Sequence, residues 1–393
     1  MATAAKKTTS KAKPAAKAAP KATPKAAPKA AKAAKPAVKS APKTAPKATV
    51  ESEGVFLREM WYFAAPGNAV RPGKMIHKTL LGEPVLIGRL NTGDVFAVRD
   101  VCPHRGIPLS YGEFDGKEVE CPYHGWRFGK DGVCTDIPSL VPGQDFEASR
   151  IKTKAYPCRE VQGNVWVYFG EKKDNLPAIP EVPEIGHMYQ FHLSLTFPCN
   201  VDHAVIGLMD PAHGPYVHRS PIWRSKFTSY AKEKKFSPRG LGWVMDRHRA
   251  SKNSKAYKIF LGGLPETEID FQLPSTRREH AKTDKYTYCG LTACTPVSAM
   301  VTEVHHVIYF DVPWLGFFNP LLKLIATAFL GQDGRVVAQQ QHGLSFDPTL
   351  LLIKDADQMA MWYFKIKKEY LEAQAEGRSF VNPIKECILK WRS

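Results

Sequence analysis

Two short clusters of cysteine and histidine constrain this chain more than any other feature of its sequence. Cys102 and His104 form Cys-x-His within CPHRG, and Cys121 and His124 form Cys-x-x-His within CPYHGW, with 16 residues between the clusters. Thiolates and imidazoles are common protein ligands of transition metals. The pattern therefore predicts a metal centre held by two Cys and two His from two loops.

Two thiolates and two imidazoles suit a Rieske [2Fe–2S] cluster, in which two His replace two Cys on one iron. The neutral imidazoles raise the reduction potential from about −400 mV to roughly −150 to +300 mV. Structural zinc is one alternative, but zinc fingers usually pair Cys with Cys and His with His. The other alternative is that two buried Cys and two polar His occur at this spacing by chance and bind no metal. Pro103 and Pro122 would stiffen the two loops, Gly106 and Gly125 permit tight turns, and Trp126 could shield a cluster from solvent.

The charge of the chain is distributed very unevenly. The 393 residues carry a net charge of +17, yet residues 1–50 hold 13 Lys and no Asp, Glu or Arg. The remaining part is close to neutral. It is long enough and apolar enough, at 44% hydrophobic residues over the whole chain, to build about two domains with large cores.

Residues 1–52 are predicted to be a disordered basic tail of Ala, Lys and Pro. Proline at short intervals blocks a continuous helix, and lysine repulsion with little apolar bulk prevents a core. Such a tail either keeps the protein soluble or makes a weak electrostatic contact with nucleic acid or an anionic membrane. It has no aromatic residue to stack on bases, which weakens the case for single-strand binding.

The cysteines and the N-terminus predict a cytoplasmic protein. The eight Cys are scattered without the rhythm of a disulfide scaffold, and a reducing compartment keeps thiolates available for iron. The N-terminus shows no apolar stretch of the kind found in a secretory signal.

The most apolar run of the chain is 312–331, VPWLGFFNPLLKLIATAFLG. It contains Pro313, Pro320 and Lys323, which argue against a helix that spans a membrane. We expect a buried helix or the lip of an apolar pocket instead.

The patterning of the chain predicts an α+β fold with two ordered domains. Residues 53–172 contain short alternating runs such as EPVLIGRL and NVWVYFG, separated by Gly, Asp and Asn, as in a β-rich domain. The polar, proline-rich EKKDNLPAIPEVPE at 171–184 is typical of a linker. Residues 173–393 mix strand-like segments with helical ones, including ADQMAMWYFKIKKEYLEAQAEG near the C-terminus.

The words CPHRG and CPYHGWRF closely resemble the Rieske domain of the Rieske non-haem iron oxygenases, the ring-hydroxylating oxygenase alpha subunits. With GVCTDIP further along, the chain is most similar in style to the oxygenase components of vanillate O-demethylase and phthalate oxygenase. The resemblance covers about residues 55–375. It implies a Rieske β-sandwich at 53–172, followed at 173–393 by a helix-grip (START-like) catalytic domain that holds a mononuclear iron.

A second metal site is indicated by Asp210, His213 and His218 in the segment MDPAHGPYVH. Two His and one carboxylate on one face are the ligands of a mononuclear non-haem Fe(II) centre with open positions. The spacing Asp-x-x-His-x-x-x-x-His resembles the iron motif of the family, which implies that His213 and His218 are ligands. The resemblance also implies that Asp210 hydrogen-bonds to His213 and connects it to His124 of a neighbouring subunit.

The third iron ligand must come from far along the chain, and the best match is Asp333 in GQDGRVV. An Asp at this place is also explained by the start of a helix, where backbone N–H groups favour a carboxylate. Asp311 and Asp347 remain alternatives.

The resemblance implies a terminal oxygenase component. Such a protein activates O₂ and hydroxylates or oxidatively demethylates a hydrophobic ring compound, here an aromatic, a sterol or a terpenoid. The chain has no strand–GxGxxG–helix unit, so electrons from NAD(P)H must come through a separate reductase, and a ferredoxin is a further candidate partner.

The family further implies a homotrimer closed head to tail. The alternative function is a Rieske-type electron-transfer protein without oxygenase activity. It leaves residues 185–393 and their His, His and Asp set unexplained.

Overall fold

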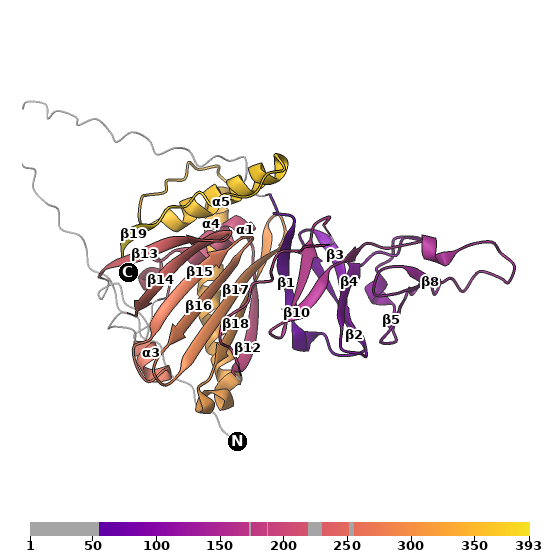
Figure 1. Ribbon diagram of the computed structural model, residues 1–393, viewed down its shortest axis with the longest axis horizontal. Coiled ribbons are helices and arrows are strands. Elements are labelled where there is room, and N and C mark those ends of the chain that lie inside the picture. The colour runs from indigo at the N-terminus through magenta and orange to yellow at the C-terminus, as the bar shows by residue number, and fades with distance from the viewer. Residues whose placement is uncertain (1–54, 173, 187, 219–229, 251–254) are drawn as a thin grey trace, which may run out of the picture. The chain divides into compact units, whose positions relative to one another are not determined.

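The computed structural model describes residues 55–172, 174–186, 188–218, 230–250 and 255–393 (Figure 1). Over these residues the chain is an α+β protein, as predicted: an N-terminal β part precedes a large antiparallel sheet packed against helices. The predicted basic tail lies outside the described residues, and the domain boundary at 172 stays a prediction.

The N-terminal part contains three antiparallel sheets among the described residues. The β-branched and aromatic residues that alternate along its strands fill the spaces between these sheets. Its short 3₁₀ helices are η2 (Gly67–Ala69), η3 (Leu109–Tyr111) and η4 (Ala148–Arg150). In hydrogen-bonded order, the strands are β1 (Met60–Pro66), β11 (Asn164–Phe169) and β10 (Cys158–Val161); β2 (Lys74–Leu80), β3 (Glu83–Arg89), β4 (Val95–Arg99) and β9 (Ala155–Tyr156); and β5 (Glu113–Phe114), β6 (Val119–Glu120), β7 (Arg127–Phe128) and β8 (Cys134–Asp136).

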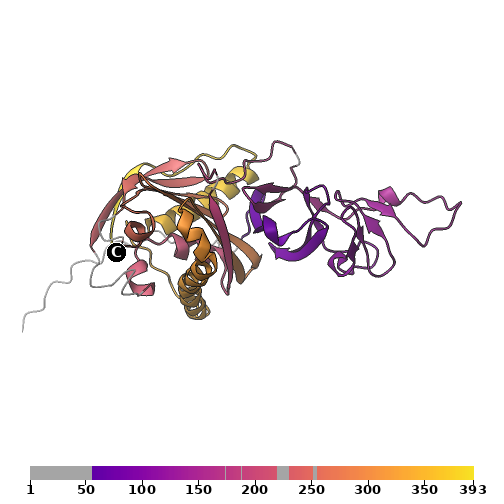
Figure 2. The ribbon, with the colours of Figure 1, turned by 90° about the horizontal axis from the view of Figure 1, so that it is seen from below.

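The C-terminal part is built on an eight-stranded antiparallel sheet (Figures 1 and 2). The strand order is mostly that of a meander, with the last strand added beside β13. In this order the strands are β12 (Tyr189–Phe197), β18 (Val301–Phe310), β17 (Thr287–Ser298), β16 (Thr276–Lys282), β15 (Glu266–Gln272), β14 (Gly242–Arg249), β13 (Ala231–Arg239) and β19 (Cys387–Arg392). The helices are α1 (Val201–Met209), α2 (Gly214–Val217), α3 (Lys255–Phe260), η6 (Pro313–Phe318), α4 (Asn319–Leu344) and α5 (Gln358–Ala375).

The large sheet is covered on both faces, because successive side chains of a strand point to opposite sides. On one face Phe271 of β15 packs edge to face against Tyr363 of α5, with ring centroids 5.8 Å apart. On the other face Val307 of β18 belongs to a buried cluster with Phe63 and Trp166 from the N-terminal part. Burial on both sides agrees with the almost continuous burial of β17, in which nine of the 12 residues are buried.

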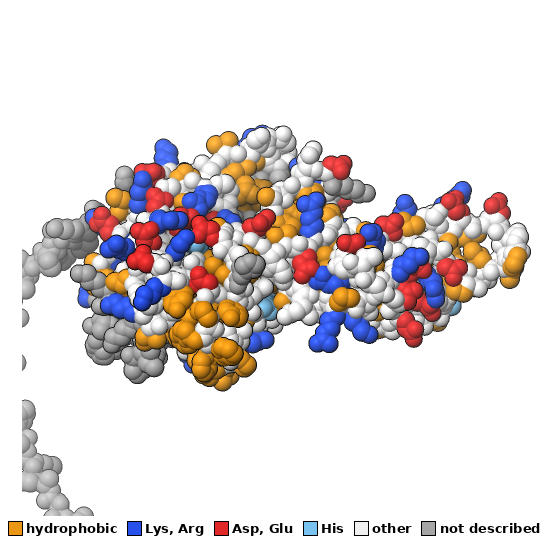
Figure 3. Space-filling view, turned by 60° about the horizontal axis from the view of Figure 1, so that its bottom comes forward, with side chains coloured by type: hydrophobic (Ala, Val, Ile, Leu, Met, Phe, Trp, Pro, Cys, Tyr) orange, Lys and Arg blue, Asp and Glu red, His pale blue; other side chains and the backbone are white. Residues whose placement is uncertain are grey.

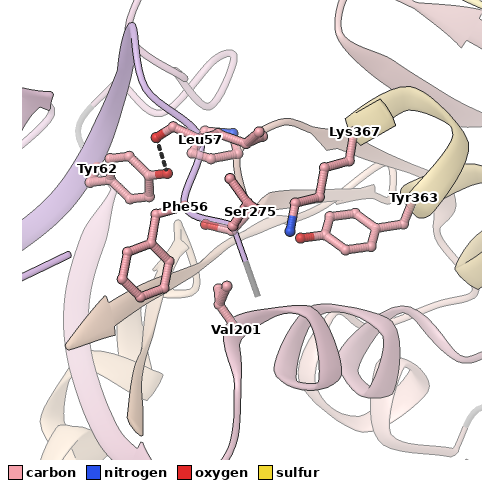
Figure 4. A pocket seen from close by; sticks show the side chains of 9 residues that line it. Phe56, Leu57, Tyr62, Val201, Ser275, Tyr363 and Lys367 are labelled. Carbon is pink, nitrogen blue, oxygen red and sulfur yellow. Dashed lines mark hydrogen bonds between the residues drawn. The ribbon is translucent and has the colours of Figure 1, made fainter. Parts of the chain in front are cut away.

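A buried ion pair joins α5 to α1, the helix that leads into the predicted iron motif. Lys367 donates to both carboxylate oxygens of Asp202 at 2.7 and 2.8 Å, and Tyr363 donates to the same carboxylate at 2.6 Å. Both charged side chains are at most 1% exposed. Burial and the negative charge of Asp202 raise the pKa of Tyr363 well above its usual range, so it remains a donor. Figure 4 shows Lys367 and Tyr363 side by side, pointing toward Ser275.

Replacing Lys367 by Met should destabilise the fold strongly, because the Asp202 carboxylate would then stay buried without its cation. We expect Lys367→Met to lower the free energy of unfolding by about 3–5 kcal/mol. The side chain of the neighbouring Lys368 is 44% exposed and makes a loose ion pair with Glu372 at 3.7 Å, so Lys368→Met should change the free energy of unfolding by less than about 0.5 kcal/mol. Denaturant unfolding followed by circular dichroism measures both; equal losses in the two variants would contradict the assignment.

The expectation of a buried helix at 312–331 is wrong for most of its length. Pro313 and Pro320 lie in the first turns of η6 and α4, where a helix tolerates proline, so the run does become helical. Of the described helices, Pro313–Leu344 is long and apolar enough to cross a membrane, yet only 11% of its apolar window is buried. Leu315 and Leu322 pack into the core, while most other apolar side chains of the run point outward.

Candidate metal centres

The loops CPHRG and CPYHGW adopt the same backbone arrangement. In each, the Cys N–H donates to a carbonyl five residues on, and the N–H of a glycine four residues on donates back to the Cys carbonyl. Both glycines have positive φ, +76° and +71°, which other residues rarely adopt. The bonds are Cys102 N to Ile107 O (2.8 Å) and Gly106 N to Cys102 O (2.8 Å), and Cys121 N to Trp126 O (2.8 Å) and Gly125 N to Cys121 O (3.0 Å).

The two loops place sulfur inside and imidazole outside. Cys102 and Cys121 are buried in one apolar cluster, whereas His104 is exposed and His124 half-buried. The two imidazole centroids lie 4.7 Å apart, and the ring of His104 stacks on Trp126 at 4.3 Å. Nδ1 of His124 is buried and has no hydrogen-bond partner among the described residues, as suits a metal ligand. The donor set therefore fits a Rieske cluster, in which the buried Cys102 and Cys121 would hold one iron and the more exposed His104 and His124 the other.

The surroundings of these side chains shift the pKa of Cys102 and of His124 in different directions. Burial raises the pKa of the Cys102 thiol to about 11, and the backbone N–H groups of His104 and Arg105 act in the opposite direction by hydrogen-bonding to the sulfur. Burial, followed by the charges of His104 and Arg105, lowers the pKa of His124 and favours its neutral, metal-binding form. The Arg105 guanidinium lies over the Tyr123 ring, 5.7 Å from its centroid, and so connects the two loops.

The second site is formed by His213, His218 and Asp333. The His residues flank α2, a single helical turn with Pro215 near its start, and Asp333 comes from the middle of α4. The two Nε2 atoms are 3.1 Å apart, and Asp333 Oδ1 lies 3.5 Å from that of His213 and 3.2 Å from that of His218. Two imidazoles and one carboxylate at these separations fit a mononuclear iron.

The possible ligand atoms of these three residues all lie within 4.8 Å of one another. Among the described residues, no other set of three or more His, Cys, Asp or Glu side chains is this close. The four cluster residues do not converge in this way, although a single tetrahedral zinc would require it. A binuclear cluster needs only pairs of ligands, one pair for each iron, so this geometry favours iron and sulfur over zinc.

The alternatives for the third ligand are placed elsewhere. Asp311 accepts a hydrogen bond from the backbone N–H of Thr287 at 2.7 Å, and Asp347 lies exposed beyond the end of α4. Neither belongs to the group around His213 and His218. The geometry therefore favours Asp333.

Hydrogen bonds fix the orientation of both iron-site imidazoles. Nδ1 of His213 donates to the backbone carbonyl of Asp210 at 2.7 Å, and Nδ1 of His218 donates to Oε1 of Gln332 at 3.0 Å. A proton on Nδ1 leaves Nε2 of both rings free to bind metal. The ring of His218 also stacks on Phe329, with centroids 3.8 Å apart.

Asp210 differs in one detail from its predicted role. Its backbone carbonyl, and not its carboxylate, accepts the close bond from His213; carboxylate Oδ2 is 3.7 Å from Nδ1. Carboxylate Oδ1 accepts from the backbone N–H of Ala212 at 2.7 Å. Burial raises the pKa of this carboxyl group, although a third of the side chain is still exposed.

Sequence reasoning missed the residues that hold α4 in place. A Cβ on Gly334 would lie 2.9 Å from the Phe197 ring, so glycine allows α4 to approach β12 at the turn that carries Asp333. Gln332 and Phe329 contact His218 from the same helix. The adjacency of Gln332, Asp333 and Gly334 in the sequence was the available signal.

The N-terminal part matches the model of the Rieske [2Fe-2S] domain over residues 60–157. Together with the His, His and Asp group that follows it in the chain, this match makes the chain similar to the Rieske non-haem iron oxygenases.

Curated relatives of this chain include two from different organisms. It is 29% identical over 307 residues to chlorophyllide a oxygenase of Chlamydomonas reinhardtii, covering 72% of this chain and 44% of the relative. It is 38% identical over 177 residues to the iron-sulfur subunit of the toluene-4-sulfonate monooxygenase system of Comamonas testosteroni, covering 43% and 48%. The matched part thus spans less than half the length of either relative. A special closeness to vanillate demethylase or phthalate oxygenase stays a prediction.

Solved structures of similar fold cover most of the chain. Dicamba monooxygenase bound to dicamba has a TM-score of 0.65 at 19% identity, over 82% of this chain and 99% of that one. NdmA of Pseudomonas putida CBB5 has a TM-score of 0.61 at 16% identity, over 81% and 92%. At these identities the likeness shows a shared fold.

A matched pair of substitutions tests the third ligand. Asp333→Asn should abolish binding of the mononuclear iron, because a neutral amide replaces the carboxylate, while the visible absorption of the Rieske cluster remains. Asp347→Asn makes the same chemical change at an exposed site where Asn tolerates the positive φ of 49°, and should retain all the iron. Metal analysis with absorption spectra measures both, and full iron in Asp333→Asn would contradict the assignment.

Proposed function

We propose that this protein is a terminal oxygenase component that hydroxylates or oxidatively demethylates a hydrophobic ring compound. The observation that carries the proposal is the group of His213, His218 and Asp333, in the same chain as a Rieske domain. When bound, the mononuclear iron supplies open positions for O₂ and the cluster supplies electrons.

The residues around the candidate iron site hold the imidazoles of His213 and His218 in a fixed orientation. Gln332 and the Asp210 carbonyl set the tautomers of the two imidazoles, and Phe329 covers one of them. His218 and Asp333 are largely shielded from water, with side chains 6% and 11% exposed. A shielded site favours chemistry that excludes bulk water.

The proposed substrate class is supported by the names of the relatives. The names of three relatives specify chlorophyllide a, toluene-4-sulfonate and 4beta-methylsterol, all of which contain rings. We extend only this shared chemistry to the present chain and propose a ring compound that is largely apolar.

The electron supply and location are also proposals. We propose a separate NAD(P)H-dependent reductase, with a ferredoxin as a further candidate, because the sequence shows no nucleotide-binding glycine motif. The eight cysteines are free, which supports a reducing cytoplasmic location.

Iron stoichiometry separates the oxygenase from an electron carrier. An oxygenase should bind two irons in the cluster and one at His213, His218 and Asp333, whereas a carrier would bind only the first two. Metal analysis of protein purified without oxygen, together with O₂ consumption in the presence of a reductase, makes the measurement. Two irons per chain and no oxygen consumption with any ring compound would overturn the proposal.

We further propose a head-to-tail homotrimer in which Asp210 contacts His124 of the adjacent subunit. Support comes from the Asp210 side chain, which is one-third exposed and keeps Oδ2 beyond hydrogen-bond distance of His213. A heterologous interface that closes on itself generates such a ring.

Asp210→Asn tests this contact. The amide keeps the size of the side chain and the backbone carbonyl that orients His213, but removes the negative charge. We expect both metals to remain bound and the cluster to be reducible, while its reoxidation by O₂ with substrate slows by about 10- to 100-fold. Rapid mixing of reduced protein with O₂ measures the rate. A wild-type rate, or a fully active monomer by light scattering, would refute the contact.

A further inference from the structure

The outer side of η6 and of the first half of α4 presents an apolar surface that the described residues leave uncovered. Figure 3 shows a dense group of apolar side chains where these elements face the viewer. Phe317 is 87% exposed and Leu324 is 67% exposed. We define the apolar cap by its exposed members: Trp314, Phe317, Phe318, Leu321, Leu324 and Ile325.

The cap is a continuous stripe, separate from the side of the helix that packs into the core. Its members recur every three or four residues, which places them along one helical face. Leu315 and Leu322, between them in sequence, belong to a buried cluster with Phe310 of β18. The segment therefore has two apolar sides, and the described residues pack against only one of them.

Contiguous exposed apolar patches of this kind mark binding surfaces in soluble proteins. The charges of the cap narrow the choice of partner. Residues 312–332 contain no Asp or Glu, and their one charged residue is the exposed Lys323. Residues 1–50 of the same chain contribute 13 Lys and no acidic residue. An apolar stripe with a cation on it and a polycationic segment elsewhere in the chain match an anionic lipid surface, where apolar insertion and electrostatic attraction act together.

A protein partner fits the cap less well. Protein interfaces carry about one hydrogen bond per 100–200 Å² and a polar rim, but cap side chains other than Trp314 offer no hydrogen-bonding group. Lipid needs none, and tryptophan is favoured at the depth of the headgroups.

The geometry of α4 also limits how deeply the segment can enter. Its second half carries Asp333 and is packed against β12 through Gly334 and Phe197. The cap spans residues 314–325, about 18 Å of helix, whereas the hydrocarbon core of a bilayer is about 30 Å thick. The segment can therefore lie in one leaflet but cannot cross both without dismantling the iron site.

We propose that the apolar cap inserts into the surface of an anionic lipid bilayer and docks the protein peripherally on one leaflet, with the Lys-rich N-terminal segment as a second, electrostatic attachment. This proposal does not depend on the reaction that the protein catalyses.

Vesicle flotation with the full-length, metal-loaded protein tests the proposal. The wild type should float with vesicles of phosphatidylcholine and phosphatidylglycerol, and less with phosphatidylcholine alone or at high salt. The cap variant Phe317→Ser/Leu321→Ser/Leu324→Ser should bind the anionic vesicles at least about tenfold more weakly. The control Phe346→Ser/Leu350→Ser/Leu351→Ser removes side chains that are 74%, 52% and 77% exposed outside the cap, and should bind as the wild type does.

A second measurement shows whether the cap itself enters the lipid. Brominated lipids should quench the tryptophan fluorescence of the wild type more than that of Trp314→Phe. Unfolding midpoints and the absorption of the Rieske cluster show whether the variants fold. If the triple cap variant does not, Phe317→Ser alone is used, with a smaller loss of binding expected.

Three results would overturn the proposal. One is vesicle binding by the cap variant equal to that of the wild type, which would leave only the Lys-rich segment in contact with lipid. Another is equal quenching in the wild type and Trp314→Phe. The third is a change of molecular mass in the cap variant by light scattering with unchanged vesicle binding, which would make the cap a contact between copies of this chain.

Discussion

The close approach of α4 to β12 is the contact on which the candidate iron site depends. His213 and His218 lie next to each other because a single helical turn separates them, but Asp333 is more than 100 residues away. Gly334 lets the helix meet the Phe197 ring, and Gln332 and Phe329 attach the same turns to His218. On the preceding side, the buried pair of Asp202 and Lys367 ties α1 to α5. The iron ligands are thus supported by contacts on two sides.

The two metal centres are built by different means, and this determined how far each could be predicted from sequence. The cluster loops are local: each closes through bonds between residues four and five apart, so their spacing alone was enough to predict the candidate ligands. The pair of iron histidines is local as well. The carboxylate is not, and choosing Asp333 over Asp311 or Asp347 required the path of α4 across the sheet. Which oxygen of Asp210 receives the His213 proton likewise depends on backbone geometry.

The α+β class followed from alternating and helical apolar patterns, which record burial on one side of each element. The same logic failed for 312–331, because apolar content predicts that a segment avoids water without saying what shields it. Leu315 and Leu322 are shielded by the protein, as expected, while Phe317 and Leu324 are not. When a segment has more apolar residues than the core can bury, the excess indicates a binding surface. Only the structure showed which side chains of 312–331 face the core and which face outward.

Helix α4 therefore contributes both to the apolar cap and to the candidate iron site, with a different half of the helix in each. Its first half, with η6, carries the apolar cap, and its second half carries Asp333. Asp333 lies nine positions after Leu324, or about 14 Å along the helix axis. If the cap lies at a lipid surface and the site acts on an apolar ring compound, the substrate and the site meet within one helix length, and the substrate need not cross water to arrive. Because the apolar cap and Asp333 share α4, a change in the direction of this helix at a lipid surface would also move the carboxylate.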